Sequence, residues 1–193
     1  DREAAAKVEQ HLKRAKPKVK QHERILRALI HPKAHADKRT DFPLDNAALD
    51  SIFSAADEIF FNGKLSRRVH WDWTSEGKHA SSSSSRRGEG GVSRIIGYTA
   101  LRKAMQKDGY ETLIVLSSPI LKDTSYNRRL LISTFLHELI HSYLFICNGF
   151  EARHCGGHTP GFKRIAELID EWEGHGTLRL CDIEADLDRF REE

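Results

Sequence analysis

The stretch from about Tyr126 to Cys147 constrains the fold most, because nearly every position around it is apolar. A surface helix carries one apolar stripe, whereas a helix that is apolar on all sides has to be buried. We therefore expect one long central helix with the other elements packed around it. Its apolar residues are Leu130, Leu131, Ile132, Phe135, Leu136, Leu139, Ile140, Tyr143, Leu144, Phe145 and Ile146.

Three ionisable residues, His137, Glu138 and His141, interrupt the apolar run of this helix in the pattern HExxH. Histidines four residues apart lie on one helical face, so both imidazoles can reach one zinc ion at about 2.0–2.1 Å. Glu138 is rotated about 100° from His137, which favours a base beside the metal over a third ligand. Burying these groups without partners costs several kcal/mol, which metal coordination would offset. The alternative is two core histidines bonded to carbonyls.

A hydrolytic zinc site needs a third protein ligand and one open position for water. The candidates downstream are His158, His154 and Cys155. We prefer His158, because it directly precedes the helix start at Thr159 and would be held by a rigid element. Zinc would lower the pKa of its bound water towards about 7 and polarise a carbonyl, while Glu138 takes the proton of the water. The predicted reaction class is metal-assisted hydrolysis.

The elements around this helix are predicted from periodicity and capping signals. Short links between three strand-like segments favour an antiparallel or mixed sheet, which indicates an α+β fold. On the first strand, Trp71 and Trp73 share one face, where they would either join the core or stack on nucleic-acid bases. The expected elements are a helix from Asp45 or Asn46 to Asn62 with a left-handed cap at Gly63, strands at 69–74, 93–101 and 112–116, and a helix from Pro160 to Gly174 capped by Thr159.

Composition divides the chain into two parts. Residues 1–40 form a basic helical arm and linker, with two helical pieces broken at Pro17, and residues 41–193 form the main domain. Within that domain the serine, arginine and glycine composition of residues 76–92 predicts a flexible insertion loop.

Charge is uneven along the chain. The formal net charge is +3, but residues 1–40 hold 12 lysines and arginines against 5 acidic residues. This points to an acidic partner such as DNA, or else to a solvated helix face.

Three cysteines without a CxxC pair argue against a disulfide framework. With no apolar run of about 18 residues and no apolar leader, we expect an intracellular protein without a membrane partner.

The chain resembles the SprT-like metalloprotease family, which includes the Spartan-type proteases of DNA–protein crosslinks. The resemblance covers about residues 45–190. It implies a compact zincin-like α+β domain with a small, mostly antiparallel sheet around the HExxH helix, the zinc ligands His137, His141 and His158, and the catalytic residue Glu138. The matching segments are Ile52 to Phe60 with Asn62 and Leu65, Val69-His70-Trp71, Leu116 to Lys122, Leu136 to Phe145, and Gly157-His158-Thr159-Pro160-Gly161-Phe162.

Three departures from the Spartan pattern stand beside this resemblance. The spacing from His141 to His158 is longer, residues 76–92 look inserted, and the chain stops at Glu193 before any cysteine-rich subdomain. Residues 178–181 are similar to the ending of fungal members of the family. We therefore expect a monomeric, nuclear zinc endopeptidase that acts on DNA-associated or DNA-crosslinked proteins. The alternative function is a non-catalytic, zinc-stabilised module that binds chromatin or protein.

Overall fold

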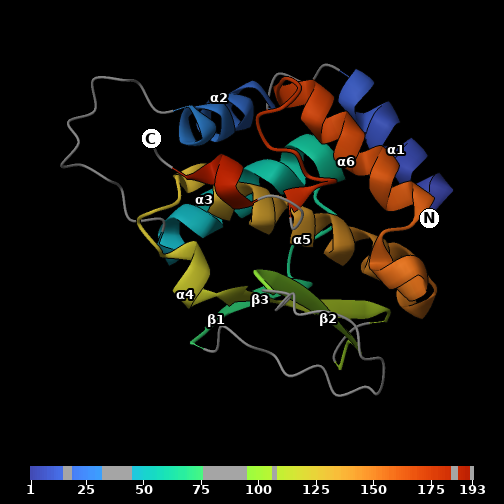
Figure 1. The fold of residues 1–193 in the computed structure, drawn as a ribbon. Helices are drawn as coiled ribbons and strands as arrows, with labels where there is room; N and C mark the ends of the chain where they lie inside the picture. The colour runs from blue at the N-terminus through green and yellow to red at the C-terminus, as the bar shows by residue number, and fades with distance from the viewer. Residues whose placement is uncertain (15–18, 32–44, 76–94, 106–107, 184–186, 192–193) are drawn as a thin grey trace.

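A computed structural model describes residues 1–14, 19–31, 45–75, 95–105, 108–183 and 187–191 of the protein. The architecture is α+β, as predicted. A three-stranded sheet lies on one side of a long central helix, α5 (Arg128–Asn148), and the other long helices lie on the opposite side (Figure 1). The central helix is therefore covered from both sides, which is what its apolar surface requires.

Helix α5 begins after Asn127, whose side chain accepts a hydrogen bond from the backbone N–H of Arg129. Every residue from Leu130 to Phe145 is buried, which confirms the predicted central helix. By length and composition alone, the helical stretch Arg128–Gly157 is apolar enough to cross a membrane. In this fold 89% of its most apolar window is buried inside the protein, so the core already uses that surface.

The sheet has the strand order β1-β3-β2 and is mixed. Strand β3 (Tyr110–Ser117) lies in the centre, antiparallel to β2 (Gly97–Lys103) and parallel to β1 (Val69–Thr74). The expectation of a mostly antiparallel sheet therefore holds for one pair of the two. The chain reverses into β2 and again into β3, so β3 runs in the same direction as β1 and pairs with both neighbours.

One face of the sheet packs on α5. Ile114 of β3 is fully buried there, and Trp71 of β1 is paired with it in register. The ring of Trp71 contacts Phe53 and Phe135, at centroid distances of 5.3 and 5.4 Å. The indole nitrogen of Trp73, on the same face, donates to Asn46. The two tryptophans are thus partly buried and pack against the core, which favours the packing interpretation over base stacking.

Helix α3 (Asn46–Ala56) is capped by Asp45, as predicted, and continues into the π-helical turn η1 (Asp57–Phe61). The left-handed cap residue is Asn62 (φ 54°) rather than the predicted Gly63, although Gly63 also has positive φ. Thr159 caps helix α6 (Pro160–Glu173) as predicted. Three shorter elements are α4 (Ser118–Leu121), η2 (Gly149–Gly157) and η4 (Leu187–Phe190).

The basic arm contributes two helices that pack on the rest of the molecule. Helix α1 (Arg2–Lys13) lies against α6, and α2 (Val19–Ile30) lies against α3. Leu26 and Ile30 of α2 are fully buried, so apolar residues of the arm are part of the core. The predicted break at Pro17, the linker and the loop at 76–92 lie outside the described residues. The division at residue 40 stays a prediction.

Candidate metal centre

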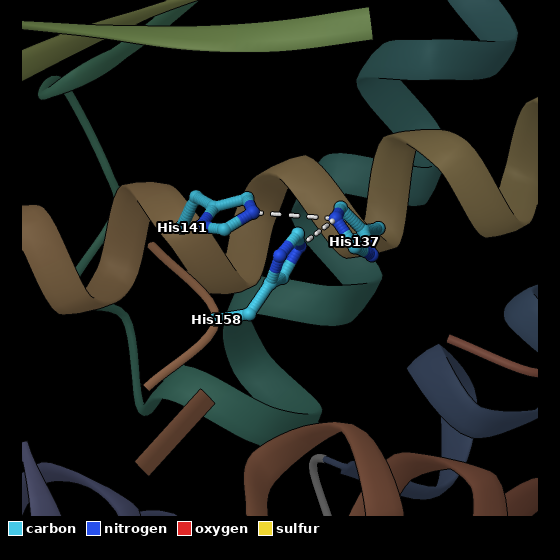
Figure 2. A group of neighbouring side chains, drawn as sticks. All are labelled: His137, His141 and His158. Carbon is cyan, nitrogen blue, oxygen red and sulfur yellow. Dashed lines mark hydrogen bonds between the residues drawn. The ribbon is translucent and has the colours of Figure 1, made fainter. Parts of the chain in front are cut away.

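Three histidines from two segments converge beside α5. His137 and His141 project from one face of that helix, and His158 follows η2 just before α6 (Figure 2). The Nε2 atom of His137 lies 3.2 Å from Nε2 of His141 and 3.1 Å from Nε2 of His158. The ligand atoms of all three residues are within 4.8 Å of one another. In the described part of the chain, this is the one such group of metal-ligating side chains.

These separations are close to those of a zinc site. Two nitrogens bound to one tetrahedral zinc at about 2.0–2.1 Å lie about 3.3–3.4 Å apart. The two measured separations at His137 are only slightly shorter than that. The ligand atoms of the third pair, His141 and His158, are at most 4.8 Å apart, so an adjustment of the rings would bring all three nitrogens to one ion. Three imidazoles would leave one position open for water.

The tautomer of His137 is set by a backbone contact. Its Nδ1–H donates to the carbonyl oxygen of Leu180 at 2.8 Å, so Nε2 carries the lone pair that faces the other two rings. The pKa of His137 is lowered to about 4, because burial and, to a smaller extent, the neighbouring His158 lower it more than the carbonyl of Leu180 raises it. The imidazole is therefore neutral at physiological pH, which is the form that binds metal.

His141 is held neutral even more strongly. Burial, followed by the neighbouring His137 and His158, lowers its pKa to about 2. The single lone pair on Nε2 of His137 cannot satisfy two nitrogen neighbours with good hydrogen bonds. One shared cation would satisfy all three rings at once. The donor set therefore fits zinc, which takes neutral histidine nitrogens in tetrahedral sites.

The rings are backed by Phe162 in the first turn of α6. Its centroid lies 4.4 Å from that of His141 in a stacked arrangement and 4.8 Å from those of His137 and His158. Gly157 lets the chain before His158 pass close to His141, because a Cβ there would lie 2.9 Å from Cε1 of His141 and its φ is +86°. The glycine turn and the rigid start of α6 together fix His158 opposite α5.

Glu138 is also buried, and it lies next to strand β2. The hydroxyl of Thr99 donates to its Oε2 at 2.6 Å. Gly97, two residues earlier, leaves space for the carboxylate, because a Cβ at Gly97 would lie 3.4 Å from Oε1 of Glu138. The predicted base therefore sits between α5 and the sheet, on the helix that carries two of the three histidines.

The two alternative third ligands lie outside this cluster. His154 and Cys155 are both exposed, and the extended backbone of His154 separates them from the helical turn before it. The structure thus brings together His137, His141 and His158, as expected from the sequence.

Two contacts of the site were not identified from the sequence. Leu180 acts through its carbonyl oxygen, which leaves no side-chain signal. Thr99 lies 39 residues from Glu138 in the sequence. The alternation of side chains along strand β2 was the one sequence pattern that could have placed Thr99 on the face towards α5. Finding its partner required the tertiary structure.

Comparison with known proteins gives the family. The SprT-like family profile matches residues 49–182, which is more than half of the chain. Proteins named DNA-dependent metalloprotease SPRTN from rat, mouse and human are each 35% identical over 78 residues. That alignment covers 40% of this chain but 15% of each relative. No solved structure gives a significant match. On the extent of the profile match, the chain belongs to the SprT-like family.

Proposed function

We propose that this chain is a zinc-dependent endopeptidase. The observation that carries the proposal is the convergence of His137, His141 and His158 within 4.8 Å, with Glu138 buried beside them on α5. The names of the SPRTN relatives support it, because they describe a metalloprotease. Zinc bound by the three imidazoles would supply a Lewis acid and an acidified water.

Glu138 is the general base in this proposal. Its carboxylate accepts a proton from the attacking water and returns it to the departing amine, which has to be protonated to leave. The role requires a carboxylate that is close to the metal without binding it. The contact of Glu138 with Thr99, on the sheet side, is consistent with that arrangement.

A peptide substrate would approach along strand β2. Among the described residues β2 pairs with β3 alone, so its other edge offers backbone N–H and C=O groups. An extended peptide can add to such an edge as a further strand. Because Thr99 of β2 contacts Glu138, a peptide on this edge would lie near the proposed base.

DNA-associated or DNA-crosslinked proteins are the substrates we propose, with a nuclear location. The name of the relatives, DNA-dependent metalloprotease, supports this. The arm is the proposed DNA contact, but part of its charge is matched internally. Lys7 and Lys13 pair with Glu3 and Glu9 on α1, and Arg27 pairs with Glu173. The remaining basic residues of the arm would therefore carry the DNA interaction.

The test of the function combines metal analysis with a cleavage assay on the Glu138→Gln variant. We expect about one zinc per chain in both proteins, and cleavage of a DNA-bound protein by the parent alone. Glutamine keeps the shape of the side chain but cannot take the proton of the water. The assay is run with and without single-stranded DNA, which separates DNA dependence from proteolysis.

The outcomes distinguish the two candidate functions. Zinc retention without cleavage by the parent would favour the non-catalytic binding module. Equal cleavage by parent and Glu138→Gln would remove Glu138 from the mechanism. Cleavage that is indifferent to DNA would leave a DNA-independent peptidase.

A further inference from the structure

Thr99 of strand β2 donates a hydrogen bond to the carboxylate of the proposed base. Its Oγ1 lies 2.6 Å from Oε2 of Glu138 and 3.2 Å from the backbone oxygen of the same residue. A hydroxyl has one proton to donate, and the carboxylate oxygen is both the nearer and the stronger of the two acceptors. The proton of Thr99 therefore points to Oε2.

The position of this hydroxyl is set by the sheet. Thr99 is paired with Ile114 of the central strand, so its backbone is fixed from outside the active-site helix. Gly97 and Leu101, which share its face, are both buried. The missing side chain at Gly97 lets β2 come close to α5, because a Cβ there would also lie 3.2 Å from the Cγ2 of Thr134.

We propose that Thr99 is a positioning residue for Glu138, an inference that rests on the proposed peptidase function. The hydroxyl holds Oε2 in a fixed place and keeps its own proton throughout. The carboxylate is then presented in one orientation to the water whose proton it takes and passes on. Losing that bond removes one restraint on the terminal torsion of the carboxylate, a torsion that is intrinsically broad.

A second hydrogen bond between sheet and helix provides a matched control. Thr112 of β3 is buried and donates to the hydroxyl of Ser142 on α5 at 2.9 Å. It joins the same two elements as Thr99, but its partner is a neutral hydroxyl outside the proposed chemistry. Removing it reports on loosening of the sheet–helix contact alone.

The experiment compares the zinc-loaded full chain with Thr99→Val, Thr99→Ser and Thr112→Val. Cleavage of fluorescein-labelled casein in the presence of single-stranded DNA gives kcat and KM. We expect Thr99→Val to lower kcat about tenfold to a hundredfold, the range for losing a hydrogen bond to a charged group. Its KM and zinc content stay within about twofold of the parent. Thr99→Ser restores most of kcat, and Thr112→Val lowers the melting temperature without lowering kcat.

A structural readout accompanies the kinetics. In zinc-loaded crystals, the carboxylate of Glu138 should be displaced or disordered in Thr99→Val and held in the parent and in Thr99→Ser. An unmoved carboxylate, or a kcat loss equalled by Thr112→Val, would overturn the proposal. If the parent cleaves nothing, the peptidase function fails, and the crystal comparison still decides whether Thr99 holds Glu138.

Discussion

Two clusters of ionisable side chains join distant parts of this molecule, and they are built on opposite principles. The metal centre brings together three imidazoles: the Nε2 atoms of His141 and His158 lie 3.2 and 3.1 Å from Nε2 of His137. The second cluster, which we call the Glu173 cluster, consists of Arg27 and His31 of the arm around Glu173 of α6.

The Glu173 cluster is satisfied by its own residues. The carboxylate of Glu173 is fully buried, and it accepts from Arg27 at 3.3 Å and from Nε2 of His31. Arg27 also donates to the carbonyl oxygen of Trp172 at 2.7 Å, with its guanidinium 4.2 Å from the ring of that residue. Donors meet acceptors here, so no external ion is needed.

The difference shows how a ligand site can be told from a structural one. A buried carboxylate and the N–H groups that surround it satisfy one another within the protein. Several buried nitrogen lone pairs that converge cannot do so, and they need a further partner such as a metal ion. The stability contributed by the Glu173 cluster should therefore depend on its own residues, whereas the state of the metal centre should depend on the bound ion. The following predictions test that contrast, beginning with the largest effect.

Loss of a metal ligand should be the largest effect. We expect His158→Ala to weaken zinc binding by roughly a thousandfold, about 4 kcal/mol, because one of three protein ligands is lost. His154→Ala is the matched control, since His154 is exposed and outside the cluster. Competition with a chromophoric chelator measures both affinities. A loss in His154→Ala with none in His158→Ala would transfer the third ligand to His154.

Mild acid should destabilise the metal-free protein. An unfolded histidine takes up a proton below about pH 6.5, whereas folded His137 and His141 stay neutral down to about pH 4 and 2. Stability is therefore full above pH 6.5 and falls as the pH is lowered. At pH 5.5 the loss is about 1.4 kcal/mol for each histidine. Urea unfolding at pH 7.5 and 5.5 measures it.

The His141→Gln variant is the control for this acid effect. Burial raises the pKa of Asp57 and Asp170, so these carboxyls titrate in the opposite sense. The difference between parent and His141→Gln isolates the histidine contribution. If the change in unfolding free energy between pH 7.5 and 5.5 is the same for the metal-free parent and for His141→Gln, the neutral burial of His141 is contradicted.

Removing the partners of Glu173 should destabilise the fold without releasing zinc. The double change Arg27→Ala with His31→Ala leaves a buried carboxylate without its partners and should cost about 2 kcal/mol, less than a fully buried pair because both partners are half exposed. Arg24→Ala, an exposed change on the same helix, is the control. Chemical unfolding gives the stability, and metal analysis gives the zinc content. Unchanged stability would show that the cluster does not hold the arm.

The smallest effect concerns the backbone support of His137. Asp170 of α6 accepts from the backbone N–H of Leu180 at 3.1 Å, and the carbonyl of Leu180 in turn accepts from His137. Asp170→Ala should loosen this support and weaken zinc binding about tenfold, as losses of outer contacts do. Asp170→Asn keeps an acceptor and should bind zinc nearly as the parent does. Equal affinities in all three proteins would exclude this support.

Much of the fold could be predicted from local pattern. The apolar surface around α5 required a central position, and the structure buries every residue from Leu130 to Phe145. Thr159 and Pro160 marked the start of α6 because capping depends on neighbouring residues alone. The parallel pairing of β1 with β3 was not foreseeable in the same way, because strand partners are separated by intervening chain.

The sequence by itself determined that His137 and His141 share a helical face with Glu138 beside them, because the helical repeat fixes side-chain directions locally. It also determined that this helix is central. The tertiary structure alone decided which carbonyl orients His137, which hydroxyl holds Glu138 and where the arm packs. Those contacts join residues between 39 and 146 positions apart, where the path of the whole chain, and not local propensity, brings atoms together.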